Sequence, residues 1–208
     1  MSRIGILEAA AAVFGERGYD AASTNEILAR AGLTRGALYH HFPSKESIAA
    51  AVLEAQGEAL VVPDQPVKLQ AVIDLTLAFS VRLQTDMVLR ASVRLAVEQS
   101  SFSTSAQAPY NQSITLVEDL LRQAEKQGEL LPGADLAEVA STVVAAFTGM
   151  QVMSEAFSGR QDLPARISTL WRLLLPGIAA PGMLPRLRTS CPPEPENPTG
   201  AFGGTAPA

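Results

Sequence analysis

Residues 32–46, GLTRGALYHHFPSKE, gather hydrogen-bonding, cationic and aromatic side chains in a chain that is otherwise acidic and aliphatic. Arginine can donate hydrogen bonds to guanine edges or to phosphates, and tyrosine, histidine, threonine and lysine can donate to phosphate oxygens. A glycine in such a stretch lets the backbone approach a partner closely. The residue types therefore favour DNA recognition, with these candidates: Thr34, Arg35, Gly36, Tyr39, His40, His41 and Lys45.

Catalytic and metal-binding sets are not apparent in the sequence. The only two histidines are His40 and His41, and the only cysteine is Cys191, in a Pro-rich segment. These residues do not make a metal-ligand set or a Ser/His/Asp triad, and no Gly-rich phosphate loop precedes a helix. We therefore expect no enzyme activity, no cofactor and no metal. Two plainer interpretations stay open: Gly36 relieves crowding between helices, and Tyr39 is a partly buried core aromatic.

Helix start and stop signals place the candidate residues on a helix-turn-helix. STNE (residues 23–26) is typical of a capping box that opens a short helix, and Gly32 ends that helix. Thr34 is the expected N-cap of the next helix, which Pro43 stops, and Ser44 caps a fourth. A DNA-reading motif of this kind joins two short helices through a Gly-containing turn.

A helical wheel divides the second helix of the motif into two faces. At 100° per residue, the outer face, which would enter a DNA groove, holds Arg35, Gly36, Tyr39 and His40. The inner face holds Ala37, Leu38, His41 and Phe42.

Composition predicts an all-α globular protein. The chain has 208 residues, is 47% hydrophobic and shows helical rather than alternating periodicity. A net charge of −5 argues against wrapping nucleic acid over the whole surface, because such binding needs neutralising Lys and Arg. The unpaired cysteine favours a reducing, cytoplasmic setting. The early apolar run carries Glu8, unlike a signal peptide, and the uncharged segment 139–154 is too short to span a bilayer.

We expect three parts along the chain. Residues 1–53 form a helix-turn-helix DNA-binding domain, and residues 54–187, which include a break at Pro63 and Pro66, form a larger ligand-binding and dimerisation domain. Residues 188–208 are rich in Pro and Gly and predict a disordered tail. Periodicity predicts helices of the second domain at residues 67–84, 86–100, 110–128, 135–158 and 163–179.

The helix expected around residues 139–153 is apolar nearly all round. Such a helix is buried on two faces. One face would serve its own core and the other a partner chain. The plainer alternative is a central helix wholly inside one subunit.

The segment ILEAAAAVFGERGYDAASTNEILARAGLTRGALYHHFPSKESI resembles the DNA-binding domain of TetR-family transcriptional regulators, and the similarity covers residues 4–53. The segments QGELLPGADLAEVASTVVAAFTGMQVMSE and LWRLLLPGI resemble the subgroup of γ-butyrolactone autoregulator receptors and pseudo-receptors of streptomycetes. The resemblance implies DNA contacts from Thr34, Arg35, Gly36, Tyr39, His41 and Lys45, and a phosphate contact from Ser23 or Thr24. It also implies a cytoplasmic homodimeric repressor of secondary metabolism, with a palindromic double-stranded DNA operator, a small hydrophobic effector and no membrane partner.

The chain departs from the family pattern in two places. A basic arm usually precedes the first helix, whereas residues 1–53 hold equal numbers of basic residues (Arg3, Arg17, Arg30, Arg35, Lys45) and acids (Glu8, Glu16, Asp20, Glu26, Glu46). Either the true start lies upstream, or DNA binding is weaker than usual. Receptors of the subgroup carry a tryptophan where this chain has Asn111, Gln112 and Ser113. The effector is then expected to differ from an ordinary lactone, unless Trp171 or Tyr110 replaces the indole.

Polar and aromatic residues on the expected core helices make a candidate ligand pocket: Gln56, Phe79, Tyr110, Ser113, Phe147, Thr148, Gln151 and Trp171. Gln56 is alternatively a solvent-facing residue near a helix end, and Thr148 alternatively bonds only its own backbone carbonyl. Two rival functions also remain at this point. One is a helical interaction protein whose helix-turn-helix is merely structural, and the other is a regulator without a small-molecule ligand.

Overall fold

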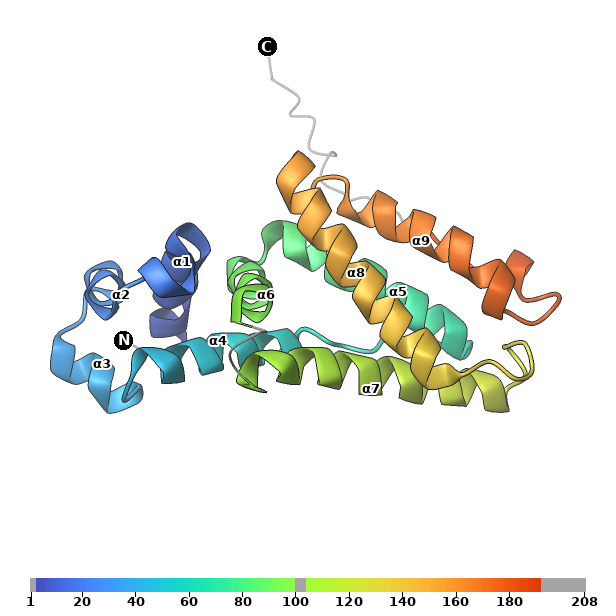
Figure 1. Cartoon of the computed structure of the whole chain (residues 1–208), viewed down its shortest axis with the longest axis horizontal. Coiled ribbons are helices and arrows are strands. Elements are labelled where there is room, and N and C mark those ends of the chain that lie inside the picture. The colour runs from blue at the N-terminus through green and yellow to red at the C-terminus, as the bar shows by residue number, and fades with distance from the viewer. Residues whose placement is uncertain (1–2, 100–103, 192–208) are drawn as a thin grey trace, which may run out of the picture.

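The computed structural model describes residues 3–99 and 104–191 and confirms the all-α fold class. Figure 1 shows two groups of helices, α1 to α3 at one end and α5, α7, α8 and α9 at the other, with α4 and α6 between them. The helices of the described residues are α1 (Arg3–Ala21), α2 (Thr24–Ala31), α3 (Arg35–His41), α4 (Lys45–Glu58), α5 (Lys68–Thr85), α6 (Met87–Gln99), α7 (Thr104–Lys126), α8 (Leu136–Ser158) and α9 (Leu163–Ile178).

The predicted caps of the helix-turn-helix are all present. Ser23 and Glu26 form a capping box at α2, and Gly32 ends that helix in the left-handed conformation, with φ of 64°. Thr34 accepts a hydrogen bond from the backbone N–H of Ala37, and Ser44 accepts one from Ser47. Because these caps satisfy N–H groups that a helix leaves unpaired, they fix where each helix begins. Beneath them lies a core of buried side chains that includes Phe14, Ile27, Leu38, Phe42 and Ile48.

The first helix is interrupted where the sequence predicts its end. Gly18 has φ of 76° and ψ of 172°, a conformation that only glycine adopts without strain. The break lies against α6: Glu98 accepts from the backbone N–H of Tyr19 at 3.0 Å, and Arg94 donates to the Gly15 carbonyl. A salt bridge joins Arg94 to Glu98. These contacts attach the helix-turn-helix domain to the second domain.

A distant carboxylate stabilises the start of α5. Val67, at the N-cap position, makes no side-chain cap. Instead the buried Glu129 accepts from the backbone N–H groups of Lys68, at 3.1 Å, and Leu69, at 2.7 Å. A negative charge is favourable there because helix N-termini are partly positive. This contact joins the loop after α7 to the helix at the centre of the domain.

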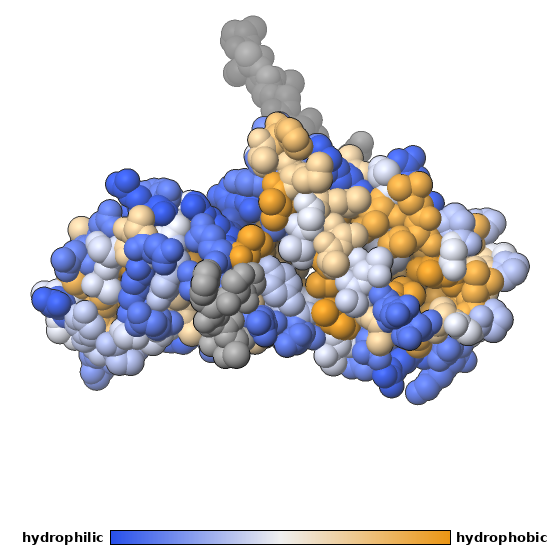
Figure 2. Space-filling view, in the orientation of Figure 1, coloured by the Kyte–Doolittle hydropathy of each residue, from blue (hydrophilic) through white to orange (hydrophobic). Residues whose placement is uncertain are grey.

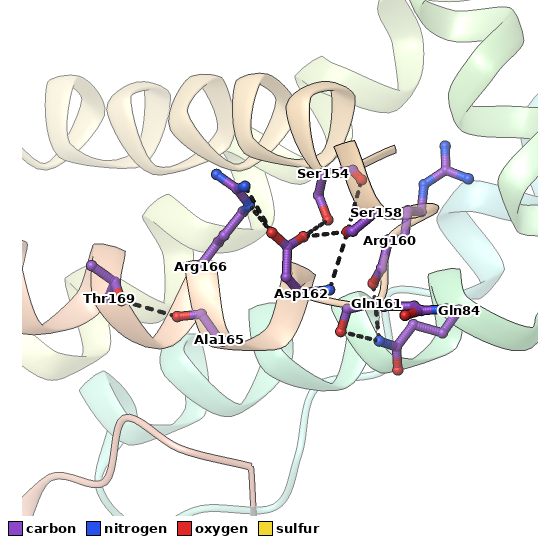
Figure 3. Close-up of polar contacts among 9 residues, drawn as sticks. All are labelled: Gln84, Ser154, Ser158, Arg160, Gln161, Asp162, Ala165, Arg166 and Thr169. Atoms are coloured by element: carbon purple, nitrogen blue, oxygen red, sulfur yellow. Dashed lines mark hydrogen bonds and ion pairs between the residues drawn. The ribbon is translucent and has the colours of Figure 1, made fainter. Parts of the chain in front are cut away.

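Asp162 organises the turn between α8 and α9 (Figure 3). Its Oδ1 atom accepts hydrogen bonds from Ser154, at 2.5 Å, and Ser158, at 2.6 Å, while Oδ2 pairs with Arg166 at 2.7 Å. Arg166 and the two serines hold the pKa of Asp162 well below its ordinary value. The carboxylate therefore stays ionised and holds the two helices together at neutral pH.

Helix α8 is not wholly inside one subunit, so the plainer alternative for it is wrong. One face, including Ala140, Val143, Gln151 and Ser154, is buried against the fold. The opposite face is open, and Phe157 is 74% exposed. Figure 2 shows this apolar surface over α8 and α9. By length and composition alone α8 could cross a membrane. This is weak evidence of a membrane span, because α8 packs on α7 and α9.

Two predicted boundaries change in the structure. Helix α7 begins at Thr104, before the expected residue 110, and includes Pro109. The carbonyl oxygen of Pro109 still accepts a hydrogen bond, from the Ser113 hydroxyl at 2.8 Å. At the other end, Arg188 exchanges two hydrogen bonds with Gln70, so the first residues of the predicted tail lie on α5. Residues 192–208 of that tail lie outside the described residues.

Candidate nucleic-acid interface and ligand cavity

Helix α3 presents its polar side chains to solvent on a buried apolar base. Leu38 and Phe42 are buried, whereas Arg35, Tyr39, His40 and His41 are exposed. The wheel was wrong about His41, which it placed on the inner face. The helix has 7 residues and ends at His41, so its last turn does not follow ideal angles. Both histidines therefore lie on the accessible side, with ring centroids 5.5 Å apart.

Gly36 lies in open space. A Cβ atom built on it meets no atom within 4 Å, so the interpretation that it relieves crowding between helices is wrong. A glycine inside a helix lowers stability by about 0.5–1 kcal/mol relative to alanine. Neighbouring helices give no packing reason for it, and its place at the centre of an exposed polar face permits close approach of a partner.

Tyr39 belongs to the same exposed face and not to the core, since it is 38% exposed. The guanidinium carbon of Arg35 lies 5.7 Å from its ring centroid. Arg35 and, to a smaller extent, the Thr24 hydroxyl hold the pKa of Tyr39 below its ordinary value. The three residues thus form a connected polar surface from the start of α2 to the middle of α3.

The hydroxyls at the helix starts differ in what they can still bind. The Ser23 hydroxyl both accepts from Glu26 N–H and donates to the Glu26 carboxylate, so its proton is engaged. Thr34 accepts from Ala37 N–H at 3.4 Å, a long bond that leaves its proton available. At the start of α2, Ser23 is exposed, whereas Thr24 is half-buried and its hydroxyl interacts with Tyr39, so both stay candidates for the phosphate contact.

Most basic residues of the first domain are already paired with acids. Arg30 pairs with Glu16 at 2.7 Å and Arg17 with Glu26 at 3.6 Å. In the described part of the chain, Arg35 and Lys45 make no salt bridge. The Lys45 ammonium lies 4.4 Å from the ring centroid of Tyr19, at the end of α3's exposed face. The domain is neutral overall, but its free positive charge is concentrated beside the polar face.

The second domain contains an apolar cavity of about 60 Å³ among α4 to α8. All but one of the predicted pocket residues line it: Gln56, Phe79, Tyr110, Ser113, Phe147, Thr148 and Gln151. Phe79 and Phe147 meet edge to face, with ring centroids 5.6 Å apart. Gln56 is only 7% exposed, so the solvent-facing alternative for it is wrong.

Trp171 is the exception, because it lies behind the cavity wall. Its side chain is fully buried, and its indole N–H donates to Thr76 Oγ1 at 2.8 Å. Thr76 itself lines the cavity, so Trp171 orients a lining residue without lining the cavity. The sequence also missed the aliphatic part of the wall, because helical spacing marks these residues as core without showing which border an empty space: Leu60, Leu75, Val93, Val117, Val143 and Val144.

The hydroxyls in the cavity are engaged by the backbone. Thr148 donates to the Val144 carbonyl at 2.8 Å, which is the plainer alternative expected for it, and Thr76 donates to Ile73. The two glutamines differ from the threonines. Each accepts one hydrogen bond through its amide oxygen, Gln56 from Ser92 and Gln151 from Arg160. Neither amide nitrogen has an acceptor among the described residues. Burial raises the pKa of the Tyr110 phenol, which stays neutral. The cavity therefore offers hydrogen-bond donors to an acceptor-bearing apolar molecule.

Comparison with known families decides what these two sites belong to. Residues 6–52 match the model of bacterial regulatory proteins of the tetR family. Residues 66–180 match the model of the tetracyclin repressor-like C-terminal domain, which alone covers more than half of the chain. The chain belongs to the TetR family. TetR-family proteins are transcriptional regulators and not enzymes, and they are soluble cytoplasmic proteins.

Within the TetR family the similarity is to streptomycete regulators. The A-factor receptor protein of Streptomyces griseus is 37% identical over 183 residues, which are 88% of this chain and 66% of the receptor. The structure of TylP, a TetR regulator from Streptomyces fradiae, is 43% identical, with a TM-score of 0.80 and 90% and 92% of the two chains covered. A γ-butyrolactone receptor structure is 30% identical, with a TM-score of 0.71 and 86% and 88% covered. The subgroup resemblance is thereby confirmed.

Proposed function

We propose that this TetR-family protein is a repressor that binds a palindromic operator as a homodimer and is released by a small hydrophobic effector. Thr34, Arg35, Gly36, Tyr39, His40, His41 and Lys45, with Ser23 or Thr24, form its DNA-binding face. The effector occupies the cavity lined by Gln56, Phe79, Tyr110 and Phe147. Similarity to a protein whose structure is described as the molecular basis for control of antibiotic production supports a role in antibiotic production or other secondary metabolism.

The observation that carries this proposal is the position of α4. The helix starts at Lys45, directly after the exposed face of α3, and its buried residues Ile48 and Val52 belong to the core of the DNA-binding domain. Near its other end it places Gln56 in the cavity wall. One rigid helix therefore contacts both sites, and a displacement at the cavity is transmitted to the helix-turn-helix.

The size of the cavity favours such a displacement. Sites for small molecules usually enclose about 300–1,000 Å³, far more than the space now open in the cavity. An effector must push the walls apart, and α4 is one of those walls. The effector therefore favours a form of the protein with a wider cavity over the form described here. The difference between its affinities for these two forms sets how far the equilibrium between DNA-bound and free protein shifts.

The open faces of α8 and α9 support the homodimer. Met153 and Phe157 on α8 and Leu173 on α9 are large apolar side chains exposed to solvent. Small residues beside them, such as Ala145 and Gly149, permit close approach of helices. A two-fold axis through this surface would form a four-helix bundle and place two recognition helices about 34–36 Å apart, one DNA turn.

Selection of bound duplexes from a random pool tests the proposal. We expect a palindrome with half-sites about one helical turn apart, whose affinity falls steeply with salt. Arg35→Gln should relax sequence preference, whereas Arg122→Gln, on α7, should not. Recovery of no sequence above background would contradict operator binding, and a non-palindromic site bound by one chain would contradict the dimer.

The effector is expected to differ from an ordinary γ-butyrolactone. Ser113 lines the cavity in the helix where receptors of the subgroup carry a tryptophan, so a large apolar wall is missing. At roughly 25 cal/mol per Å² of lost apolar contact, binding of an alkyl tail should weaken by a few kcal/mol. We expect a bulkier or more polar molecule, such as an antibiotic or its precursor, that accepts from Gln56 and donates to Thr148.

Titration with synthetic γ-butyrolactones, while release of labelled operator is followed, checks this expectation. The operator should stay bound at nanomolar lactone, and Ser113→Trp should increase the response. Release of the unmodified protein at nanomolar lactone would show that the missing tryptophan does not determine the ligand.

A further inference from the structure

A second and larger opening lies between the two domains. It is a cleft of about 500 Å³, with α1 of the DNA-binding domain on one side and α6 and α8 on the others. Its walls combine small and apolar residues, among them Ala12, Met87 and Val152, with the arginines Arg90, Arg94 and Arg160. It differs from the effector cavity, with which it shares only Gln151.

Arg160 is an unusual residue to find beside this cleft. It is the one non-glycine residue with positive φ among the described residues, at 68°. Its side chain is only 7% exposed, and its Nε–H has no hydrogen-bond partner. A buried donor without a partner costs about 1–3 kcal/mol. Figure 3 shows its side chain directed away from the Asp162 cluster, so those carboxylate oxygens do not serve it.

The partners that Arg160 does have are weak. Its Nη2 atom donates to the neutral Gln151 amide oxygen at 3.3 Å, and its Nη1 atom pairs with Glu155 at 3.0 Å. The Glu155 side chain is 53% exposed, so solvent screens that pair and the carboxylate is free to move away. The guanidinium is thus buried with incomplete compensation of its charge.

Arg90 adds a second uncompensated charge to the same cleft. It is exposed, and its side chain makes no hydrogen bond or salt bridge in the described part of the chain. Burial lowers the pKa of Arg160, the Glu155 carboxylate opposes that shift, and the charge of Arg90, which lines the same cleft, adds to it. Like charges at short range repel each other, and an anion between them would remove that repulsion.

The other charges around the cleft are already paired. Glu98 pairs with Arg94 at 2.6 Å, and Glu16 pairs with Arg30 at 2.7 Å. Among the cleft's cations, Arg90 is unpaired in the described residues and Arg160 is paired only with the half-exposed Glu155, so these two guanidinium groups are the ones that a ligand would engage. An oxyanion that receives two guanidinium groups gains strong charge-assisted hydrogen bonds.

We propose that this interdomain cleft binds an organic carboxylate with an apolar body, held by Arg90 and Arg160. The carboxylate lies between the two guanidinium groups, and the apolar body lies along Ala12, Met87 and Val152. Because α1 and α8 are on opposite sides, an occupied cleft fixes the spacing of the two domains. Gln151 is the one residue that lines both the cleft and the effector cavity.

Octanoate is a suitable probe, with octan-1-ol and inorganic phosphate as partial probes that carry only the apolar body or only the charge. We expect octanoate to bind the full chain at least about tenfold more tightly than either partial probe. With isotope-labelled methyl groups, the Met87 resonance should shift on binding, while those of Val143, in the effector cavity, and Met183, in the core, stay in place.

Two variants locate the carboxylate. Arg90→Gln removes an exposed, unpaired side chain, so it should fold normally and bind octanoate about tenfold more weakly. Arg122→Gln removes the same charge from the exposed face of α7 and should bind octanoate like the unmodified chain.

Three results would overturn the proposal: equal octanoate affinity in Arg90→Gln, equal binding of octan-1-ol, or a shift at Val143 without one at Met87. These measurements need no DNA, so they stand apart from the test of operator binding.

Discussion

The recognition face and the effector cavity use polar side chains in opposite ways. On α3, Arg35, Tyr39 and the two histidines are exposed on a buried base of Leu38 and Phe42, and their hydrogen-bonding groups face outward. In the cavity, Thr148 and Thr76 donate to their own helices, whereas the amide nitrogens of Gln56 and Gln151 have no acceptor among the described residues. The polar groups of α3 can face outward because water satisfies them, whereas most polar groups of the cavity bond within the protein, because unpaired buried groups are costly.

The largest expected effect is on the free energy of unfolding and comes from Trp171, which lies behind the cavity wall. Trp171→Ala removes a fully buried indole that donates to Thr76 at 2.8 Å, and it should lower the free energy of unfolding by about 3–5 kcal/mol. Urea denaturation at one fixed protein concentration measures this change. Trp171→Phe keeps most of the volume and should lose less. Equal stability of all three proteins would contradict the structural role assigned to this tryptophan.

Tyr39→Ala is the opposite case, with a loss of function and no loss of fold. The side chain is exposed beside Arg35, so its removal should change stability by no more than about 0.5 kcal/mol. Loss of its hydrogen bond to a charged phosphate should weaken operator binding by about 1.5–3 kcal/mol, roughly tenfold or more. Melting curves and a DNA-binding titration measure the two effects separately. If affinity is undiminished while the domain melts normally, Tyr39 does not contact DNA.

Lys45→Ala tests the difference between positioning and sequence reading on the same face. Lys45 makes no salt bridge in the described residues and lies at the start of α4, beside Tyr19. As a phosphate contact it should strengthen binding to operator and random DNA alike, so its loss should reduce the salt slope by about one unit. Affinities measured over a range of salt concentrations check this. A selective loss of operator binding would instead make Lys45 a base-reading residue.

The helix-turn-helix was predictable because its signals are local. Ser23, Gly32, Thr34 and Ser44 act within a few residues of their own positions, and the structure has each of them in the predicted role. The capping of α5 by Glu129 was not predictable, since the partners are about 60 residues apart. Helix α7 begins at Thr104 and continues through Pro109, so a proline that locally signals a helix boundary did not mark one here.

The two candidate sites differ in the same way. The spacing of Thr34, Arg35, Gly36 and Tyr39 within one short helix made the recognition face visible in the sequence. The helical wheel placed His41 on the inner face, whereas the family pattern favoured it as a contact, and the end of the helix at His41 explains the difference. For the cavity, polarity on apolar helices identified Gln56, Thr148 and Gln151. No sequence signal separated Trp171, behind the wall, from Phe147, in it, because both occupy apolar helix positions.

Gly36→Ala, with the smallest expected effect, separates what this position of α3 contributes to stability from what it contributes to DNA binding. Gly36→Ala places a methyl group in open space, so it should raise the stability of the domain by about 0.5–1 kcal/mol through helix propensity. The same methyl group would occupy the gap that lets α3 approach DNA, so operator affinity should fall while the melting temperature rises. Gly15→Ala is the matched control, because its added Cβ on α1 also meets nothing within 4 Å. It should give a similar gain in stability with unchanged operator affinity. If both variants bind operator equally well, the close approach of DNA does not depend on Gly36.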